Sequence, residues 1–350
     1  MNFSKSETSF SFVHSDGAAT ILENTSASLL ASTYQAGKFL TLRSVDKRVS
    51  TLFRSFDQAM GLAVDKRRIA VGTRSQLWFL HNAPDIASQL EPPGTHDACF
   101  LPRLCHVTGD IRVHEIAWGD KDLWLVNTRF SCLCTLHDDY SFVPRWRPPF
   151  VTALAAEDRC HLNGLAMADG RPKYVTALDE TDSAEGWRAN KATGGIVIDV
   201  PTGEVVARGF SMPHSPRIYN GQLWLLDSGT GRLVVVDTQS GRHQTVAQFP
   251  GYVRGLAFYD RYAFVGLSKA RETTTFGDLP ISARQNELKC GIWILDLTRG
   301  QIVGFFEFEK DVEEIFDVQI LPGIRYPAVV GFQKDTIHGA FVIPPEGHGL

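Results

Sequence analysis

The sequence predicts an all-β protein, a β-propeller built from four-stranded antiparallel blades. Its clearest sign is an internal repeat in which a short apolar strand, a charged or glycine-containing turn and a second apolar strand follow one another. Third and fourth strands follow most copies, and four antiparallel strands per unit are typical of a propeller blade. The turns between third and fourth strands, such as VPTGEV and DTQSGR, suit tight hairpins because glycine tolerates positive φ.

The spacing within the repeated hairpin is regular. In four copies, ten residues separate the lead residue from the aromatic or small residue of the second strand, and in the Asn163 copy eleven do. A sixth copy begins at Phe316. The lead residues are Met60, His114, Asn163, His214, Arg254 and Phe316.

The number of blades depends on the chain ends. Residues 28–56 resemble the second, third and fourth strands of a further unit, whose first strand is weak or supplied by residues 18–25. Counting this unit gives seven blades of 50 residues each over the 350-residue chain, with six blades as the alternative. Because the last copy lacks a fourth strand, we expect N- and C-terminal strands to close the ring, with TSFSFVH completing the final sheet.

The propeller accounts for residues 1–350 as a single domain, with three stretches that are long for blade loops. These stretches are residues 81–110, 179–194 and 269–289. Long loops on a rigid scaffold often carry function. Their polar composition is compatible with a lid over the central channel and equally with solvated decoration.

Composition narrows the class of protein. The 43% hydrophobic and 21% charged content is typical of a globular chain, and 35 basic against 39 acidic residues give a net charge of −4. This balance argues against nucleic-acid and membrane partners. The six scattered cysteines indicate reduced thiols, and the absence of an apolar leader or membrane span predicts a cytoplasmic protein. No phosphate-binding or dinucleotide motif is present, so we expect no nucleotide cofactor.

Polar residues lead three consecutive copies of the repeat. In a propeller the first strand of each blade is innermost, so His114, Asn163 and His214 are expected to face one another at one mouth of the channel. Imidazole and side-chain carbonyl groups bind divalent metals, which makes these three residues candidate metal ligands. A polar ligand pocket without metal, and a purely structural ring bonded to water and backbone, are the alternatives.

Further candidates surround this mouth. His161 lies two residues before Asn163, on the same strand face, and is a candidate acid or base. Arg217 and Arg254 suit an anionic group, or else pair with Asp227 or Asp317 across blades. The candidate catalytic residues are His161, His214 and Asp227. The candidate substrate-binding residues are Arg217, Arg254, Asn127, Ser215 and Asp179.

The Asn163 copy, HLNGLAMADGRPKYVTALDETD, resembles a stretch of the gluconolactonase and senescence-marker-like propellers. The resemblance implies that Asn163 is a ligand of a catalytic divalent metal. It also places His214 where that family has an aspartate that is both a ligand and the proposed base. The family's N-terminal glutamate ligand has no match, so the resemblance covers about two blades.

Over nearly its whole length the chain resembles a bacterial family of conserved hypothetical propellers, through STYQAGK, HLNGLA, MPHSPR, SGTG, RGLAF and EIFDV. This resemblance implies the fold but no reaction. Our interpretation is a propeller enzyme, with hydrolase (lactonase), isomerase or lyase chemistry on a small anionic or polar molecule. The alternative is a non-catalytic propeller that recognises a peptide or protein partner.

Overall fold

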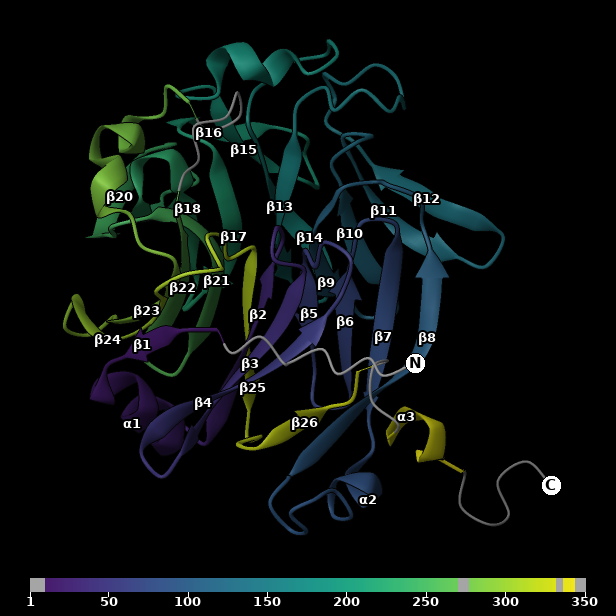
Figure 1. The fold of residues 1–350 in the computed structure, drawn as a ribbon. Helices are drawn as coiled ribbons and strands as arrows, with labels where there is room; N and C mark the ends of the chain where they lie inside the picture. The colour runs from purple at the N-terminus through teal and green to yellow at the C-terminus, as the bar shows by residue number, and fades with distance from the viewer. Residues whose placement is uncertain (1–9, 270–276, 332–335, 344–350) are drawn as a thin grey trace.

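The computed structural model describes residues 10–269, 277–331 and 336–343, and its strands form a six-bladed propeller (Figure 1). The first blade contains β25 (Asp317–Pro322), β2 (Ala27–Thr33), β3 (Lys38–Val45) and β4 (Arg48–Ser55). The second contains β5 (Leu62–Val64), β6 (Arg68–Gly72), β7 (Gln76–Asn82), β8 (Ala98–Val107) and β26 (Pro327–Val329). The third contains β9 (Val113–Trp118), β10 (Leu123–Asn127), β11 (Cys132–His137) and β12 (Tyr140–Trp146).

The remaining three blades follow in chain order. The fourth contains β13 (Leu162–Ala168), β14 (Arg171–Ala177), β15 (Gly195–Asp199) and β16 (Val205–Phe210). The fifth contains β17 (Pro213–Tyr219), β18 (Gln222–Asp227), β19 (Arg232–Val236) and β20 (His243–Gln248). The sixth contains β21 (Tyr252–Tyr259), β22 (Tyr262–Ser268), β23 (Gly291–Asp296), β24 (Gln301–Phe308) and β1 (Phe12–His14).

The prediction of seven blades was wrong, and the stated alternative of six is correct. The strand that opens the Phe316 copy, β25, pairs with β2 from Ala27 opposite Pro322 to Ser32 opposite Asp317. The two ends of the chain therefore build one blade, which the sequence count treated as two. Figure 1 shows the yellow C-terminal strand beside the purple N-terminal strands.

The expected first strand of this blade, residues 18–25, is instead mostly the helix α1 (Asp16–Asn24). Ser15 caps the helix by accepting a hydrogen bond from the backbone N–H of Ala18 at 3.3 Å, and Ala19 and Leu22 are buried against the sheets. The helix packs on β24 and β3. It therefore lies across the junction between the sixth and first blades.

Terminal strands do close the ring, but in a different way from the prediction. β1 pairs antiparallel with β24 and so extends the sixth blade, not the sheet of the Phe316 copy. After β25 the chain crosses to the second blade, where β26 pairs in parallel with β8. Both additions cover sheet edges that would otherwise expose unpaired backbone groups.

The long stretches contain regular structure. Residues 81–110 include the helix α2 (Pro84–Ala87) and the outer strand β8, so part of this stretch belongs to a blade. Residues 179–194 include the short 3₁₀ helix η1 (Gly186–Asn190), and residues 277–289 include η3 (Pro280–Glu287). Residues 270–276 of the third predicted loop lie outside the described residues.

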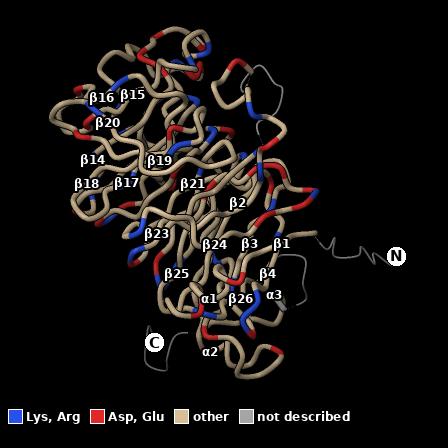
Figure 2. Tube along the Cα trace, turned by 90° about the vertical axis from the view of Figure 1, so that its left-hand side faces the viewer, with Lys and Arg blue, Asp and Glu red and all other residues tan. Residues whose placement is uncertain are grey.

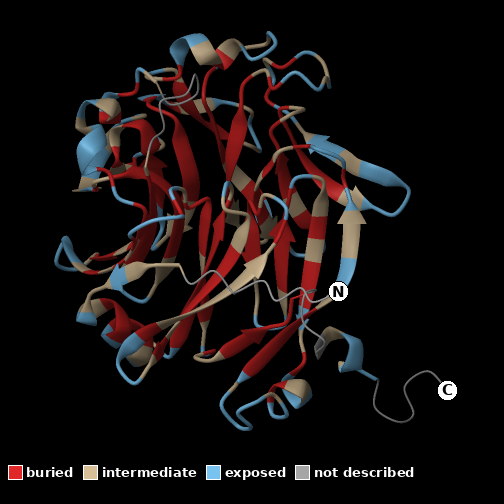
Figure 3. Ribbon diagram, in the orientation of Figure 1, coloured by how far each residue is buried: buried red, intermediate tan, exposed pale blue. Residues whose placement is uncertain are grey.

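Burial follows the blades. Buried residues occupy the central strands, whereas the outer hairpins are exposed (Figure 3). Cys132 and Cys134 pack in one of the core clusters between blades, and no disulfide joins the six cysteines, all of which lie in the described ranges. Acidic and basic residues are interspersed along the trace (Figure 2). None of the helices in the described ranges has the length and apolar character needed to cross a bilayer.

Candidate functional site

Three inner strands bring polar residues together at one mouth of the channel. His114 on β9, Asn163 on β13 and His214 on β17 lie at the corresponding early positions of their strands. The rings of His114 and His214 are 6.2 Å apart, and Asn163 Nδ2 lies 3.4 Å from His214 Nε2. His161 joins them, with its ring 4.8 Å from that of His114. We call His114, His161, Asn163 and His214 the histidine mouth.

A repeated backbone feature precedes each of these strands. Arg112, His161 and Met212 stand two residues before His114, Asn163 and His214, and their φ angles are 50°, 49° and 50°. This left-handed conformation costs a non-glycine residue about 1 kcal/mol or more, and such strain clusters at functional sites. At Arg112 and Met212 this conformation points the backbone carbonyl toward the histidine two residues later, His114 and His214 respectively.

Hydrogen bonds fix the tautomers of two imidazoles. His114 Nδ1 donates to the Arg112 carbonyl at 3.1 Å, and His214 Nδ1 donates to the Met212 carbonyl at 3.0 Å. Thr176 Oγ1 donates to Asn163 Oδ1 at 2.6 Å, which turns the amide nitrogen of Asn163 toward His214 Nε2. This network assigns the proton of each neutral ring to Nδ1 and leaves the lone pair on Nε2.

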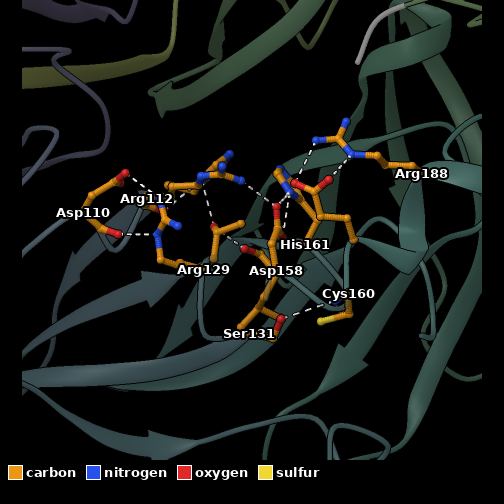
Figure 4. A network of polar contacts seen from close by, with 12 residues as sticks. Asp110, Arg112, Arg129, Ser131, Asp158, Cys160, His161 and Arg188 are labelled. Carbon is orange, nitrogen blue, oxygen red and sulfur yellow. Dashed lines mark hydrogen bonds and ion pairs between the residues drawn. The ribbon is translucent and has the colours of Figure 1, made fainter. Parts of the chain in front are cut away.

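His161 is held by a buried carboxylate. Its Nδ1 lies 3.0 and 2.9 Å from the two carboxylate oxygens of Asp158, and Arg112 Nη1 pairs with the same carboxylate at 3.0 Å (Figure 4). The ring of Trp187 packs against His161 with centroids 4.5 Å apart. Asp158 thereby fixes both the orientation and the tautomer of His161, as a carboxylate does in a catalytic dyad.

Arg254 on β21 supplies a positive charge beside the histidines. Its guanidinium lies 3.4 Å over the ring of Phe316, and its Nη1 is 3.3 Å from Glu314 Oε1. Burial first, and then the charge of Arg254, hold the pKa values of His114 and His214 well below the ordinary value of 6.5. Both rings are therefore neutral at neutral pH.

An apolar cluster from two of the long loops packs next to the mouth. Trp187 of η1 and Ile281 of η3 are almost fully buried, together with Met212 and Tyr252 at the starts of the fifth and sixth blades. Met212 and Tyr252 both adjoin His214. The rings of His214 and Tyr252 are 6.0 Å apart, and the Met212 carbonyl accepts the hydrogen bond from His214 Nδ1. Part of each of these two loops is therefore buried against the propeller.

Four other predicted residues are engaged in local hydrogen bonds. The Asp227 carboxylate accepts hydrogen bonds from Ser211 N and Arg232 Nη2, both at 2.6 Å, and so stabilises a turn. Asp179 accepts from Glu180 N and Asn190 Nδ2, both at 2.8 Å, within its own loop. Asn127 Oδ1 accepts from Phe130 N, and Ser215 Oγ accepts from Gly255 N, each at 3.1 Å.

Arg217 lies farther along the channel and pairs across blades, as the second interpretation of this residue expected. It forms an ion pair with Glu115, its Nη2 is 3.8 Å from Asp317 Oδ1, and its Nε donates to the Leu256 carbonyl at 2.9 Å. Burial raises the pKa of Glu115 to about 7, although Arg217 opposes this shift. Glu115 and Arg217 both line a cavity of about 260 Å³, together with later residues of the inner strands such as Trp118 and Met167.

The sequence analysis missed Asp158, Trp187 and Glu314. Asp158 precedes His161 by three residues, so the D-x-x-H spacing was available as a signal. Trp187 and Glu314 come from segments outside the repeated hairpin. Nothing in the repeat assigns those two residues to the mouth.

The oxygen-ligand metal site implied by the gluconolactonase resemblance does not fit these residues. Asn163 Oδ1 is occupied by Thr176, the ligand position of the family's aspartate is His214, and Arg254 brings a positive charge. Hard cations such as calcium need several oxygen ligands. Across residues 10–269, 277–331 and 336–343, no three His, Cys, Asp or Glu side chains are grouped as a metal site.

Comparisons with known proteins found solved structures and one protein family to which this chain is similar. A solved structure titled "Crystal structure of Nidogen/Laminin Complex" matches with a TM-score of 0.55 at 12% identity, over 85% of this chain and 99% of that chain. A structure of the computationally designed Ika8 protein matches with a TM-score of 0.37 at 13% identity, over 80% of this chain and 74% of that chain. No curated protein matches the sequence. The model of a family described as a domain of unknown function, DUF4915, matches residues 16–330, and the chain therefore belongs to the DUF4915 family.

Proposed function

We propose that this propeller is an enzyme that performs acid–base chemistry on a polar small molecule at the histidine mouth. The observation that carries the proposal is the pair of His161 and Asp158, buried together at 2.9 Å beside His114. Asp158 holds Nδ1, so proton transfer is left to Nε2 of His161. Neutral His114 and His214 and the Asn163 amide then position the polar groups of the substrate.

The chemistry follows from these roles. A neutral imidazole with its lone pair on Nε2 takes a proton from a substrate carbon or from water, and the imidazolium returns it in a later step. This cycle serves isomerase, lyase and hydrolase reactions, lactone opening included. The distant resemblance of the Asn163 copy to lactonases supports the last of these classes.

A substrate screen tests this proposal. Hydroxy acids, keto acids, lactones and sugar acids would be incubated with the protein and followed by ¹H NMR. We expect turnover of one class by the native protein, and loss of turnover in His161→Asn without loss of folding. His243→Asn, at an outer strand, is the matched control and should leave turnover unchanged. Binding without turnover across the panel would instead indicate a non-catalytic propeller that recognises a small molecule, peptide or protein.

A metal held by imidazoles is a second candidate for the same mouth. The observation that favours it is the anchoring of Nδ1 in His114, His161 and His214, because histidines that bind metals through Nε2 usually donate Nδ1–H to a protein acceptor. Such a set suits zinc, iron or copper. Elemental analysis of purified protein tests this candidate. Stoichiometric metal that is lost in a His114→Ala, His214→Ala double variant would support an imidazole-bound metal. Equal metal content in the native protein and the double variant would contradict it.

A further inference from the structure

Arg254 has a buried N–H group without an acceptor. The residue is 7% exposed, and no described residue accepts a hydrogen bond from its Nη2. Its Nη1 is engaged by Glu314, and one face of its guanidinium is covered by Phe316. A buried polar group left unpaired costs about 1–3 kcal/mol, so its persistence here indicates a ligand that completes it.

This guanidinium borders the histidine mouth. The ring of Phe316, which it covers, lies 5.4 Å from the ring of His114. Trp187, whose ring packs on His161, likewise has a buried Nε1–H without an acceptor in the described chain. Two unpaired N–H donors therefore adjoin the imidazoles, and donors without acceptors indicate an anionic or strongly accepting partner.

The charges around the mouth limit the charge of that partner. Arg254 faces Glu314, Arg112 faces Asp158, and the rings of His114 and His214 are neutral. The phenols of Tyr252 and Tyr34 and the carboxyl of Asp317 also act on Arg254. A dianionic phosphate would add two charges beside Glu314 and Asp158. A single carboxylate would add only one negative charge.

We propose that the histidine mouth binds small molecules bearing one carboxylate, which accepts a hydrogen bond from Arg254 Nη2. This inference rests on the proposed function, since it names the substrate class of the same mouth.

Acetate is the probe for this site, acetamide is its neutral isostere and methyl phosphate is the dianionic competitor. The binding measurement is ¹H–¹⁵N NMR of the histidine rings. We expect acetate to shift the His114 and His214 signals saturably, with acetamide having no effect and methyl phosphate binding more weakly than acetate. A stronger response to methyl phosphate would overturn the carboxylate assignment.

Two substitutions locate the probe. Arg254→Met should weaken acetate binding about 10- to 100-fold, the range expected for loss of a charge-assisted hydrogen bond. Arg254→Lys keeps the positive charge beside Glu314 and replaces Arg254→Met as the test variant if that protein does not fold. We expect Arg254→Lys to bind acetate more weakly than the native protein. Arg68→Met is the matched control, because Arg68 also stacks on an aromatic ring, 3.8 Å from that of Trp118, but at the other end of β9 from His114. Equal acetate binding by native protein, Arg254→Met and Arg254→Lys would refute the inference.

The two proposals fail separately. His161→Asn should keep acetate binding while losing turnover. Turnover confined to neutral substrates, with no acetate binding, would refute the carboxylate inference and leave the enzyme proposal standing. Acetate binding through Arg254 without turnover of any substrate would refute the enzyme proposal and leave the carboxylate inference standing.

Discussion

Glu115 on β9 and Arg217 on β17 form an ion pair across the channel, between blades that are not neighbours in the ring. Glu115 Oε2 also accepts a hydrogen bond from the backbone N–H of Leu165 on the intervening blade, at 3.0 Å. Arg217 contacts the Leu256 carbonyl on the following blade. The pair therefore connects four successive inner strands, β9, β13, β17 and β21. The ionisation of Glu115 consequently affects the contacts between these strands.

This arrangement predicts the pH dependence of stability through Glu115. Its pKa is about 7 in the folded protein and 4.5 ordinarily, so between these values the folded state holds a proton that the unfolded state has released. The stabilisation is complete below pH 4.5 and is lost as the pH rises through about 7. Glu115→Gln should flatten this loss in denaturant titrations, whereas Glu204→Gln at an exposed carboxylate should not. An unchanged slope in Glu115→Gln would contradict the prediction.

The histidine mouth predicts the opposite slope at lower pH. His114 and His214 have folded pKa values well below 6.5, so below pH 6.5 the unfolded state takes up protons that the folded state excludes. Their contribution to stability is complete above pH 6.5 and is lost as the pH falls. His214→Gln should reduce the acid sensitivity of the unfolding midpoint. His243→Gln serves as the control, and equal acid sensitivity in both variants would refute this account.

The link between Asp158 and His161 predicts a tautomer change. Asp158→Asn removes the carboxylate that accepts from Nδ1, so the fraction of His161 protonated on Nδ1 should fall in ¹⁵N NMR spectra. Turnover, once a substrate is found, should fall by about 100-fold or more, the usual contribution of general acid–base catalysis. Asp179→Asn, at a carboxylate that accepts hydrogen bonds from Glu180 and Asn190 of its own loop, should change neither quantity. A native tautomer ratio in Asp158→Asn would exclude the proposed role.

Truncation should show how the ring is closed. A chain ending at Glu314 lacks β25, so the six residues of β2 from Ala27 to Ser32 lose their partner strand. We expect this chain to show no cooperative unfolding transition. A chain ending at Ile324 retains β25 and loses β26, and it should unfold cooperatively at a lower midpoint. Similar transitions for both truncated chains would show that β25 is dispensable.

Thiol reactivity should separate one cysteine from the rest. Five of the six cysteines are buried, whereas Cys105 on β8 is partly exposed. Burial raises the pKa of Cys99 to about 11 and that of Cys160 to about 12, which suppresses their thiolates. A chromogenic disulfide reagent should therefore titrate one thiol in the native protein, slowly, and six after denaturation. Rapid reaction of several thiols in the folded state would contradict this packing.

The repeat predicted the blade and the inner-strand positions because hairpin spacing is a local property of the chain. His114, Asn163 and His214 lie at corresponding positions in the structure for that reason. The pairing of β2 with β25 joins segments from opposite ends of the chain, so local spacing could not reveal that they form one blade. Asp227 illustrates a second limit. It was predicted as a catalytic residue, but its bonds to Ser211 and Arg232 depend on a turn geometry that the repeat does not encode.

The shared first blade has a consequence for biosynthesis. On the ribosome β2, β3 and β4 emerge early, but the strand that pairs with the inner edge of β2 is translated only after the other five blades. Until then that edge stays open to pairing with other chains, and the contact that closes it spans almost the entire sequence, a topology that folds slowly. Nascent chains of this protein should therefore depend on chaperones until their final strand is released.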